Sequence, residues 1–152
     1  MTTVAYAAVT QSGLSFDRQL WMRPEIIPGL RRLTDAIHAE GAAAGIQLGH
    51  CGNMSHKSIC GCMPVGASSG FNLYSPTFVR GLRADELPEM ARAYGRSVNL
   101  AREAGFDSVE IHAGHGYLIS QFLSPSTNHR KDEFGGSLQN RMRFMDMVME
   151  EV

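Results

Sequence analysis

The sequence of 152 residues has few cysteines, almost no net charge and no long apolar run. Three cysteines are an odd and small set, which favours a reducing cytoplasm over a disulfide-stabilised secreted protein. The formal net charge of −1 gives no sign of a basic face for nucleic acid. No window reaches the roughly 18–20 apolar residues of a membrane span, and the first six residues lack the pattern of a signal peptide. We therefore expect a cytoplasmic protein that contacts neither nucleic acid nor a membrane.

The rest of the composition is that of an ordinary folded domain. Hydrophobic residues make up 43% and charged residues 19% of the chain, and 152 residues suffice for one domain with one core. Apolar runs predict three buried strands, at 3–9, 43–48 and 107–112. Helical patterns predict helices at 24–40, 86–104 and from 138 to the end, with a short helical piece at 118–123.

The first two long helices each carry an apolar stripe at helical spacing. Pro24 opens the first helix and Gly41 stands where a C-terminal cap belongs. The stripe of the first helix is Ile26, Leu30, Leu33 and Ile37. The stripe of the second helix is Leu87, Met90, Tyr94, Val98 and Ala101. Both faces are predicted to pack on the sheet.

Two long stretches have no clear period. Residues 50–83 are rich in Gly, Ser and Pro and are predicted to be a loop, and a loop of that length is usually functional. Residues 124–141 are too polar for a core. Their Asp, Asn and Arg content fits either a solvated loop or a loop that bonds to itself over a site, and the pattern does not decide between them.

The alternation of strands and helices predicts an α/β fold with a parallel sheet. Polar residues follow the strands at their carboxyl ends, where an α/β barrel or a doubly wound sheet places its active site. No Gly-rich fingerprint follows any strand, so a dinucleotide-binding sheet is less favoured.

A cluster of polar residues leaves the third strand. His112 and His115 are separated by Ala113 and Gly114, and Tyr117 follows after Gly116. Two imidazole N–H groups can converge on one carbonyl oxygen and stabilise its developing negative charge, and a phenol can act as a general acid. A purely structural role is the alternative for a single histidine, but three such groups at one strand end favour chemistry.

Gln47 lies within the second strand, where an amide must find partners for its donor and its acceptor. Such an amide suits the edge of a heterocycle, for example the pyrimidine ring of a flavin. A core amide bonded to the backbone is an equally good interpretation of this residue alone.

A metal site is a further alternative for the histidines and cysteines. His112 and His115 are too close in sequence for the zinc helix motif, and no nearby glutamate is placed to be the general base of a zinc protease. Cys60 and Cys62 are spaced more tightly than a usual zinc knuckle. Incidental thiols in a mobile loop are therefore favoured over a metal.

These stretches resemble the Old Yellow Enzyme family of FMN-dependent oxidoreductases. The resemblance is most specific from Gly105 to Phe144, which contains the His112–Tyr117 cluster and the run Asp-Glu-Phe-Gly-Gly-Ser at 132–137. Gln47-Leu48-Gly49-His50 is similar to a preceding strand motif of the family. The resemblance implies a TIM barrel that holds FMN in its mouth, with NAD(P)H as reductant.

By this resemblance, Gln47 would bond the pyrimidine edge of the flavin. His112 and His115 would hold the carbonyl oxygen of a small enone or enoate, and Tyr117 would protonate the carbon next to that carbonyl. The reaction implied is addition of hydride and proton across the activated C=C bond, with the hydride coming from reduced flavin.

A complete barrel needs eight strands and about 250 residues. The chain has about three consecutive βα units, which by motif would be the second, third and fourth, so residues 1–152 are expected to be a fragment of a single FMN-binding TIM-barrel domain that is active only at full length. Three hypotheses remain: a truncated flavoenzyme, a non-catalytic half-barrel, and a small His/Cys metal-binding protein. Neither the alkene nor the choice between NADH and NADPH is specified, and a homo-oligomer is left open for the full-length form.

Overall fold

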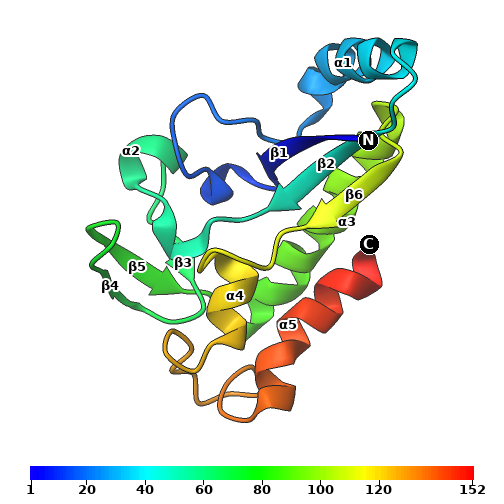
Figure 1. Cartoon of the computed structure of the whole chain (residues 1–152). Coiled ribbons are helices and arrows are strands. Elements are labelled where there is room, and N and C mark those ends of the chain that lie inside the picture. Colours follow the sequence, from blue (N-terminus) through cyan, green and yellow to red (C-terminus); the bar gives the residue numbers. More distant parts are fainter.

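A parallel three-stranded sheet lies at the centre of the computed structural model, which describes residues 1–152 (Figure 1). The strands are β1 (Thr2–Ala8), β2 (Ala44–Gly49) and β6 (Ser108–Ile111), in the order β1-β2-β6. Both pairings are parallel. The three predicted strands are therefore confirmed, each within a few residues of its expected bounds. The sheet does not close into a barrel.

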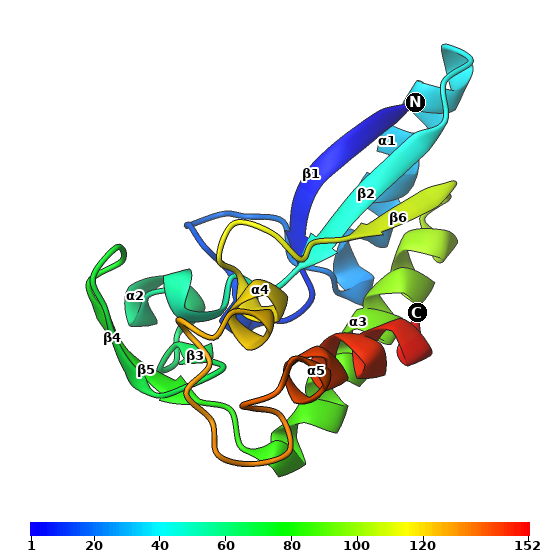
Figure 2. The same cartoon turned by 60° about the horizontal axis from the view of Figure 1, so that its bottom comes forward.

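Helices cover one face of this sheet. The long helices are α1 (Ile27–Ala39), α3 (Leu87–Glu103) and α5 (Leu138–Glu151), and the short ones are α2 (Lys57–Cys60) and α4 (Leu118–Leu123). Figure 2 shows α1, α3 and α5 on the same side of the sheet, with no helix over the other face. Short 3-10 turns occupy Gln11–Gly13, Pro24–Ile26, Gly52–Met54 and Ala84–Glu86. No helix is long and apolar enough to cross a membrane.

The alternation of side chains along β2 separates a dry face from an open one. Ala44, Ile46 and Leu48 are fully buried and belong to the main hydrophobic core. Gln47 and Gly49 have the opposite orientation and lie on the uncovered face, with Gly45 between Thr3 and Ser108. Burial of the first set stabilises the sheet against the helices.

Two expected helix faces need correction at single residues. Leu33 is 40% exposed, whereas its neighbour Thr34 is buried. The Thr34 hydroxyl donates to the carbonyl of Ala104 at 2.6 Å, so a polar group joins α1 to the end of α3. In α3, Leu87, Tyr94 and Ala101 are buried as predicted, while Met90 and Val98 are only partly buried.

The expectation of a plain loop at 50–83 is wrong in part. This stretch contains α2 and a second small sheet of β3 (Val65–Gly66), β4 (Gly70–Asn72) and β5 (Thr77–Gly81), in the order β3-β5-β4. The β4–β5 pair is an antiparallel hairpin in which Phe71 faces Phe78. Both rings are exposed, 50% and 71%, so no buried period marks these strands.

Candidate active site

The predicted polar cluster lies where β1, β2 and β6 end. His112 directly follows β6, and its backbone N–H donates to the carbonyl of Leu48 at 2.8 Å. The backbone N–H of Leu118 donates to the carbonyl of His50 at 2.9 Å. The loop from 112 to 118 is thereby held against the end of β2. The parallel arrangement brings Tyr6, Gly49 and His112 together at one edge.

His112 and His115 bond to each other in this structure. Nδ1 of His115 and Nε2 of His112 are 3.0 Å apart, so one ring donates to the other. Burial is the main cause that lowers the pKa of His112 below its ordinary value, and the nearby His115 ring is the second. This imidazole is therefore neutral at pH 7. The expected arrangement, with both rings donating to a third oxygen, therefore requires that oxygen to replace the bond between the rings.

The backbone at His115 is strained. Its φ of 56° lies in the left-handed region, and Gly116 follows with φ of 69°. Histidine is among the few residue types that tolerate this region, and such outliers cluster at functional sites. Two hydrogen bonds hold the loop in this conformation. The Tyr117 N–H donates to the carbonyl of Gly114 at 3.0 Å, and the Gln121 amide donates to the carbonyl of Gly116 at 2.6 Å.

Tyr117 stands at the N-terminal cap of α4. Its ring meets His112 edge-on at 5.1 Å between centroids and Tyr6 at 5.2 Å. The hydrogen bonds around the cluster involve Tyr6, the two histidines and Gln121, and none involves the Tyr117 hydroxyl. This half-buried phenol is therefore free to donate a proton to a bound molecule.

Tyr6 belongs to the site and was not identified from the sequence. Its hydroxyl donates to the carbonyl of Gly13 at 2.7 Å, and burial raises the pKa of this phenol far above its usual value, so it stays protonated. A Cβ at residue 49 would lie 2.5 Å from the Tyr6 ring, so the ring fits only because Gly49 has no side chain. An aromatic residue among alanines of a strand was the available signal.

Gln121 is the second residue that sequence reasoning did not single out. It is 1% exposed, and its amide nitrogen lies 2.9 Å from Oδ1 of Asn53 as well as 2.6 Å from the carbonyl of Gly116. Its Oε1 accepts from the Asn53 N–H at 3.3 Å. One buried amide thus ties the loop after β2 to the loop after β6. A glutamine among apolar neighbours on a short helix was the signal.

Gln47 lies on the open face of the sheet and is half-buried. Its Nε2 donates to Oε1 of Glu110 at 2.7 Å, and Glu110 is the register partner of Gln47 on β6. The alternative of a core amide bonded to backbone is therefore wrong. An amide that faces the uncovered side, with a carboxylate as its only side-chain partner, fits the edge of a bound heterocycle such as the flavin of FMN.

The structure gives no support to a metal-binding protein. No group of three or more His, Cys, Asp or Glu side chains is placed to hold a metal ion. His56 instead lies 2.5 Å from the Ser75 hydroxyl through its Nε2. Cys51 is fully buried and donates to the carbonyl of Leu14 at 3.3 Å, and burial raises its pKa to about 12.

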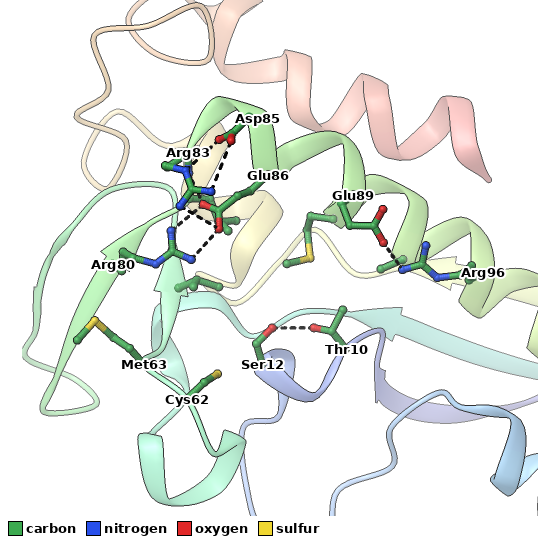
Figure 3. Close-up of a pocket in the computed structure, with 14 residues that line it drawn as sticks. Thr10, Ser12, Cys62, Met63, Arg80, Arg83, Asp85, Glu86, Glu89 and Arg96 are labelled. Carbon is green, nitrogen blue, oxygen red and sulfur yellow. Dashed lines mark hydrogen bonds and ion pairs between the residues drawn. The ribbon is translucent and has the colours of Figure 1, made fainter.

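A cavity of about 570 Å³ lies apart from this cluster, between the loops after β1 and β2 and the start of α3 (Figure 3). Its lining includes Cys62 and Met63 together with charged side chains from β5 to α3. None of the four predicted site residues lines it.

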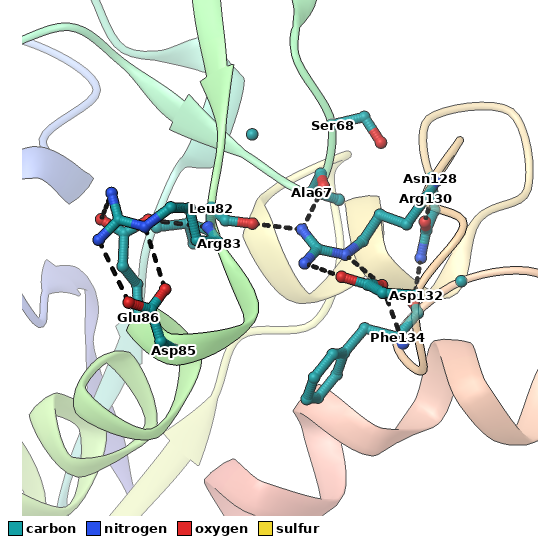
Figure 4. A network of polar contacts seen from close by, with 12 residues as sticks. Ala67, Ser68, Leu82, Arg83, Asp85, Glu86, Asn128, Arg130, Asp132 and Phe134 are labelled. Carbon is teal, nitrogen blue, oxygen red and sulfur yellow. Dashed lines mark hydrogen bonds and ion pairs between the residues drawn. The ribbon is translucent and has the colours of Figure 1, made fainter.

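Residues 124–141 form a loop that bonds to itself. The Arg130 guanidinium, whose side chain is 8% exposed, donates to the carbonyls of Ala67 and Leu82 and pairs with Asp132 at 2.6 Å (Figure 4). The Asn128 amide donates to the carbonyls of Phe122 and Phe134, both at 2.8 Å. Of the two interpretations of this stretch, the structure supports the self-bonded loop. It fastens the small sheet to the region of α4.

Comparison with known proteins gives one consistent result. The model of the NADH:flavin oxidoreductase / NADH oxidase family matches residues 1–152. The 4,4'-dithiodibutanoate disulfide reductase of Rhodococcus erythropolis is 40% identical over all of this chain and 38% of its own length. An NADPH dehydrogenase of Bacillus subtilis (strain 168) is 39% identical over 98% of this chain and 44% of its own length.

Solved structures agree with the sequence relatives. The Old Yellow Enzyme homologue from Zymomonas mobilis matches 98% of this chain and 45% of its own, with a TM-score of 0.91 and 33% identity. Morphinone reductase in complex with tetrahydroNAD matches 98% of this chain and 47% of its own, with a TM-score of 0.91 and 28% identity. The chain thus spans less than half the length of each of these relatives.

Proposed function

The chain belongs to the NADH:flavin oxidoreductase / NADH oxidase family, and from this membership we propose that the protein containing it is an ene-reductase of the Old Yellow Enzyme type. It would use NAD(P)H to reduce the activated C=C bond of α,β-unsaturated carbonyl compounds. The observation that carries this proposal is the cluster of His112, His115 and Tyr117 at one edge of the parallel sheet.

Residues 1–152 would form part of a single FMN-binding (β/α)8 barrel, with about three βα units. The support is an open parallel sheet with its helices on one face, together with relatives about twice as long. FMN, when bound, supplies the hydride. Gln47, which faces the uncovered side of the sheet, would hold the pyrimidine edge of FMN.

The histidines would bind the oxygen of the substrate. When the N–H groups of the two imidazoles turn toward one oxygen, they exchange the 3.0 Å hydrogen bond between the rings for two hydrogen bonds to that oxygen. As negative charge grows on the oxygen during reduction, these donors would bind it more strongly in the transition state than in the ground state, which lowers the barrier.

Tyr117 would donate the proton. Its ring packs edge-on to His112 at 5.1 Å between centroids and its hydroxyl makes no hydrogen bond, so this phenol would serve a molecule held by the histidines. The proton goes to the carbon next to the carbonyl, and the tyrosinate left behind is reprotonated from water. Tyr6 fixes both rings by packing against them.

The test is an anaerobic assay of the complete FMN-loaded protein with NADH or NADPH. With 2-cyclohexenone, the proposal predicts oxidation of the nicotinamide and formation of cyclohexanone in equal amounts. Cyclohexene is the matched control, because it has the same ring and double bond but no carbonyl for the histidines to hold. Equal turnover with both compounds, or none with either, would contradict the proposal.

A disulfide is the second candidate acceptor. The relative from Rhodococcus erythropolis, named for reduction of 4,4'-dithiodibutanoate, is 40% identical over the entire chain. The same assay with 4,4'-dithiodibutanoate separates the two candidates. Faster turnover with the disulfide than with the enone would favour this second acceptor.

A further inference from the structure

Two free thiols stand close together at the end of α2, apart from the histidine cluster. The Sγ atoms of Cys60 and Cys62 are 3.7 Å apart, and no disulfide joins them. Gly61 between them has a φ of 75°, in the left-handed region, and its N–H caps the helix on the carbonyl of Lys57 at 2.9 Å. This turn brings the two side chains to the same side of the chain.

The two thiols differ in accessibility. Cys60 is 2% exposed, and its sulfur lies 3.2 Å from the carbonyls of His56 and of Cys62. Cys62 is exposed and lines the cavity of about 570 Å³, beside Met63 and Arg80 (Figure 3). An outside reagent therefore reaches Cys62, while Cys60 reaches only the sulfur of Cys62.

We propose that Cys60 and Cys62 form a thiol–disulfide exchange site for a low-molecular-weight disulfide, with Cys62 as the attacking thiol and Cys60 as the resolving thiol. The Cys62 thiolate attacks one sulfur of the reagent, which forms a mixed disulfide and releases the first small thiol. The Cys60 thiolate then attacks Sγ of Cys62, which forms the Cys60–Cys62 disulfide and releases the second small thiol. Two protein thiols are oxidised, one small disulfide is reduced, and both protons pass to the leaving thiolates.

The geometry allows the second step with a small movement. The sulfur atoms must approach from 3.7 Å to about 2.05 Å, and Gly61 gives the turn the freedom to tighten. The site is independent of the proposed reductase activity, because neither cysteine lies in the histidine cluster. Cys51 serves as an internal reference, since it is fully buried and its thiol donates a hydrogen bond to the carbonyl of Leu14.

The experiment treats the complete protein, with oxidised FMN and without NAD(P)H, with oxidised glutathione. Alkylation, tryptic digestion and mass spectrometry then report each thiol. Cleavage after Lys57 and Arg80 places Cys60 and Cys62 on one peptide, 58–80, and Cys51 on another, 33–57. We expect peptide 58–80 to lose two hydrogens and to resist alkylation, while Cys51 forms no disulfide.

Two single variants test the assigned order. In Cys60→Ser, the glutathione adduct on Cys62 should accumulate about tenfold above wild type, because no resolving thiol removes it. In Cys62→Ser, peptide 58–80 should remain unmodified, because Cys60 is buried. Absence of the 60–62 disulfide in wild type, or an adduct that forms on Cys60 in Cys62→Ser, would overturn the proposal. The folded state of each variant is checked by its retained FMN.

Discussion

Among single residues, a few side chains would carry the proposed chemistry, and their neighbours orient them. The hydrogen bond between His112 and His115 joins a buried ring to an exposed one, and in the proposed function an incoming oxygen replaces it. The left-handed backbone of His115 aims that ring, and Gln121 holds the loop. In the proposed function, such a site would bind an uncharged acceptor oxygen or a phenolate.

Replacement of either histidine should weaken phenol binding. In the complete FMN-loaded protein, His112→Ala and His115→Ala each remove one donor to the same oxygen, so each should raise the Kd for a para-substituted phenol about tenfold, from loss of about 1.4 kcal/mol. Titration of the flavin absorbance measures it. His115→Asn is the control, because asparagine tolerates the left-handed backbone and keeps an N–H donor. Unchanged affinity in both alanine variants would remove the histidines from the oxygen site.

His50 should make stability depend on pH. Burial lowers its pKa to about 3, and its Nδ1 accepts from the Gly52 N–H at 2.9 Å. The unfolded chain, with an ordinary histidine pKa of about 6.5, binds the proton more readily. The contribution of His50 to the free energy of unfolding is therefore fully present above about pH 6.5. It is lost as the pH drops from about 6.5 toward 3.

Urea unfolding of the complete protein at pH 7 and pH 4.5 tests this. His50→Asn keeps an acceptor for Gly52 but cannot titrate, so its loss of stability on acidification should be smaller than that of wild type by about 2–3 kcal/mol, at 1.36 kcal/mol per pKa unit. His129→Asn, at an exposed histidine, should behave as wild type. Equal acid losses in wild type and His50→Asn would show that His50 does not carry the effect.

Among the helices and strands, the main sheet and its helices are predictable because their buried apolar residues recur at a regular spacing in the sequence. Ile46 and Leu48 repeat on the dry face of β2, and Leu87, Tyr94 and Ala101 repeat along α3. The β4–β5 hairpin leaves no such period, because its aromatic side chains are exposed and its strands are three and five residues long. Strands of this kind are defined by backbone pairing, which the sequence does not display.

The candidate site was likewise predictable only where its features follow from spacing along the chain. The positions of His112, His115 and Tyr117 at a strand end were predictable from their spacing. The bond between the two rings was not, because it depends on the left-handed backbone at His115. Tyr6 was missed because its role depends on Gly49, a residue of the neighbouring strand, and pairing across strands is not visible along one.

The Arg130 network should hold the small sheet in place. Arg130→Ala removes donors from the carbonyls of Ala67 and Leu82 and leaves Asp132 unpaired. We therefore expect a loss of about 2–4 kcal/mol in the free energy of unfolding of the complete protein. Arg83→Ala is the matched control: its side chain is 65% exposed, and its pairs with Asp85 and Glu86 should contribute less than about 1 kcal/mol. Hydrogen exchange in 65–82 should increase in Arg130→Ala alone. Similar exchange in both variants would contradict the role of this network.

At the scale of the whole molecule, the sheet is open on both sides. β1 and β6 are its edge strands, and the Leu20–Met22 segment covers only the end of β1 at Ala8. Unpaired strand edges require a partner or water. The uncovered face also exposes the Gln47–Glu110 pair to solvent.

Residues 1–152 produced alone should therefore bind FMN weakly and catalyse no turnover. The phosphate of a barrel-bound cofactor is held by loops after the seventh and eighth strands, and three main-sheet strands do not provide them. We expect aggregation, a molten state or association with a complementary fragment. Gel filtration with absorbance detection checks this. A monomer of 16.6 kDa that keeps stoichiometric FMN would refute the prediction.

In the proposed function, Tyr117 is the proton donor of an FMN-dependent alkene reductase. Stopped-flow absorbance of the flavin in the complete protein with Tyr117→Phe tests this role, one half-reaction at a time. Reduction of the flavin by NAD(P)H should be nearly unchanged. Reoxidation by the enone should slow by roughly 100- to 10,000-fold, the contribution of a general acid. An equal loss in both half-reactions, or no loss in the second, would contradict the assignment of Tyr117.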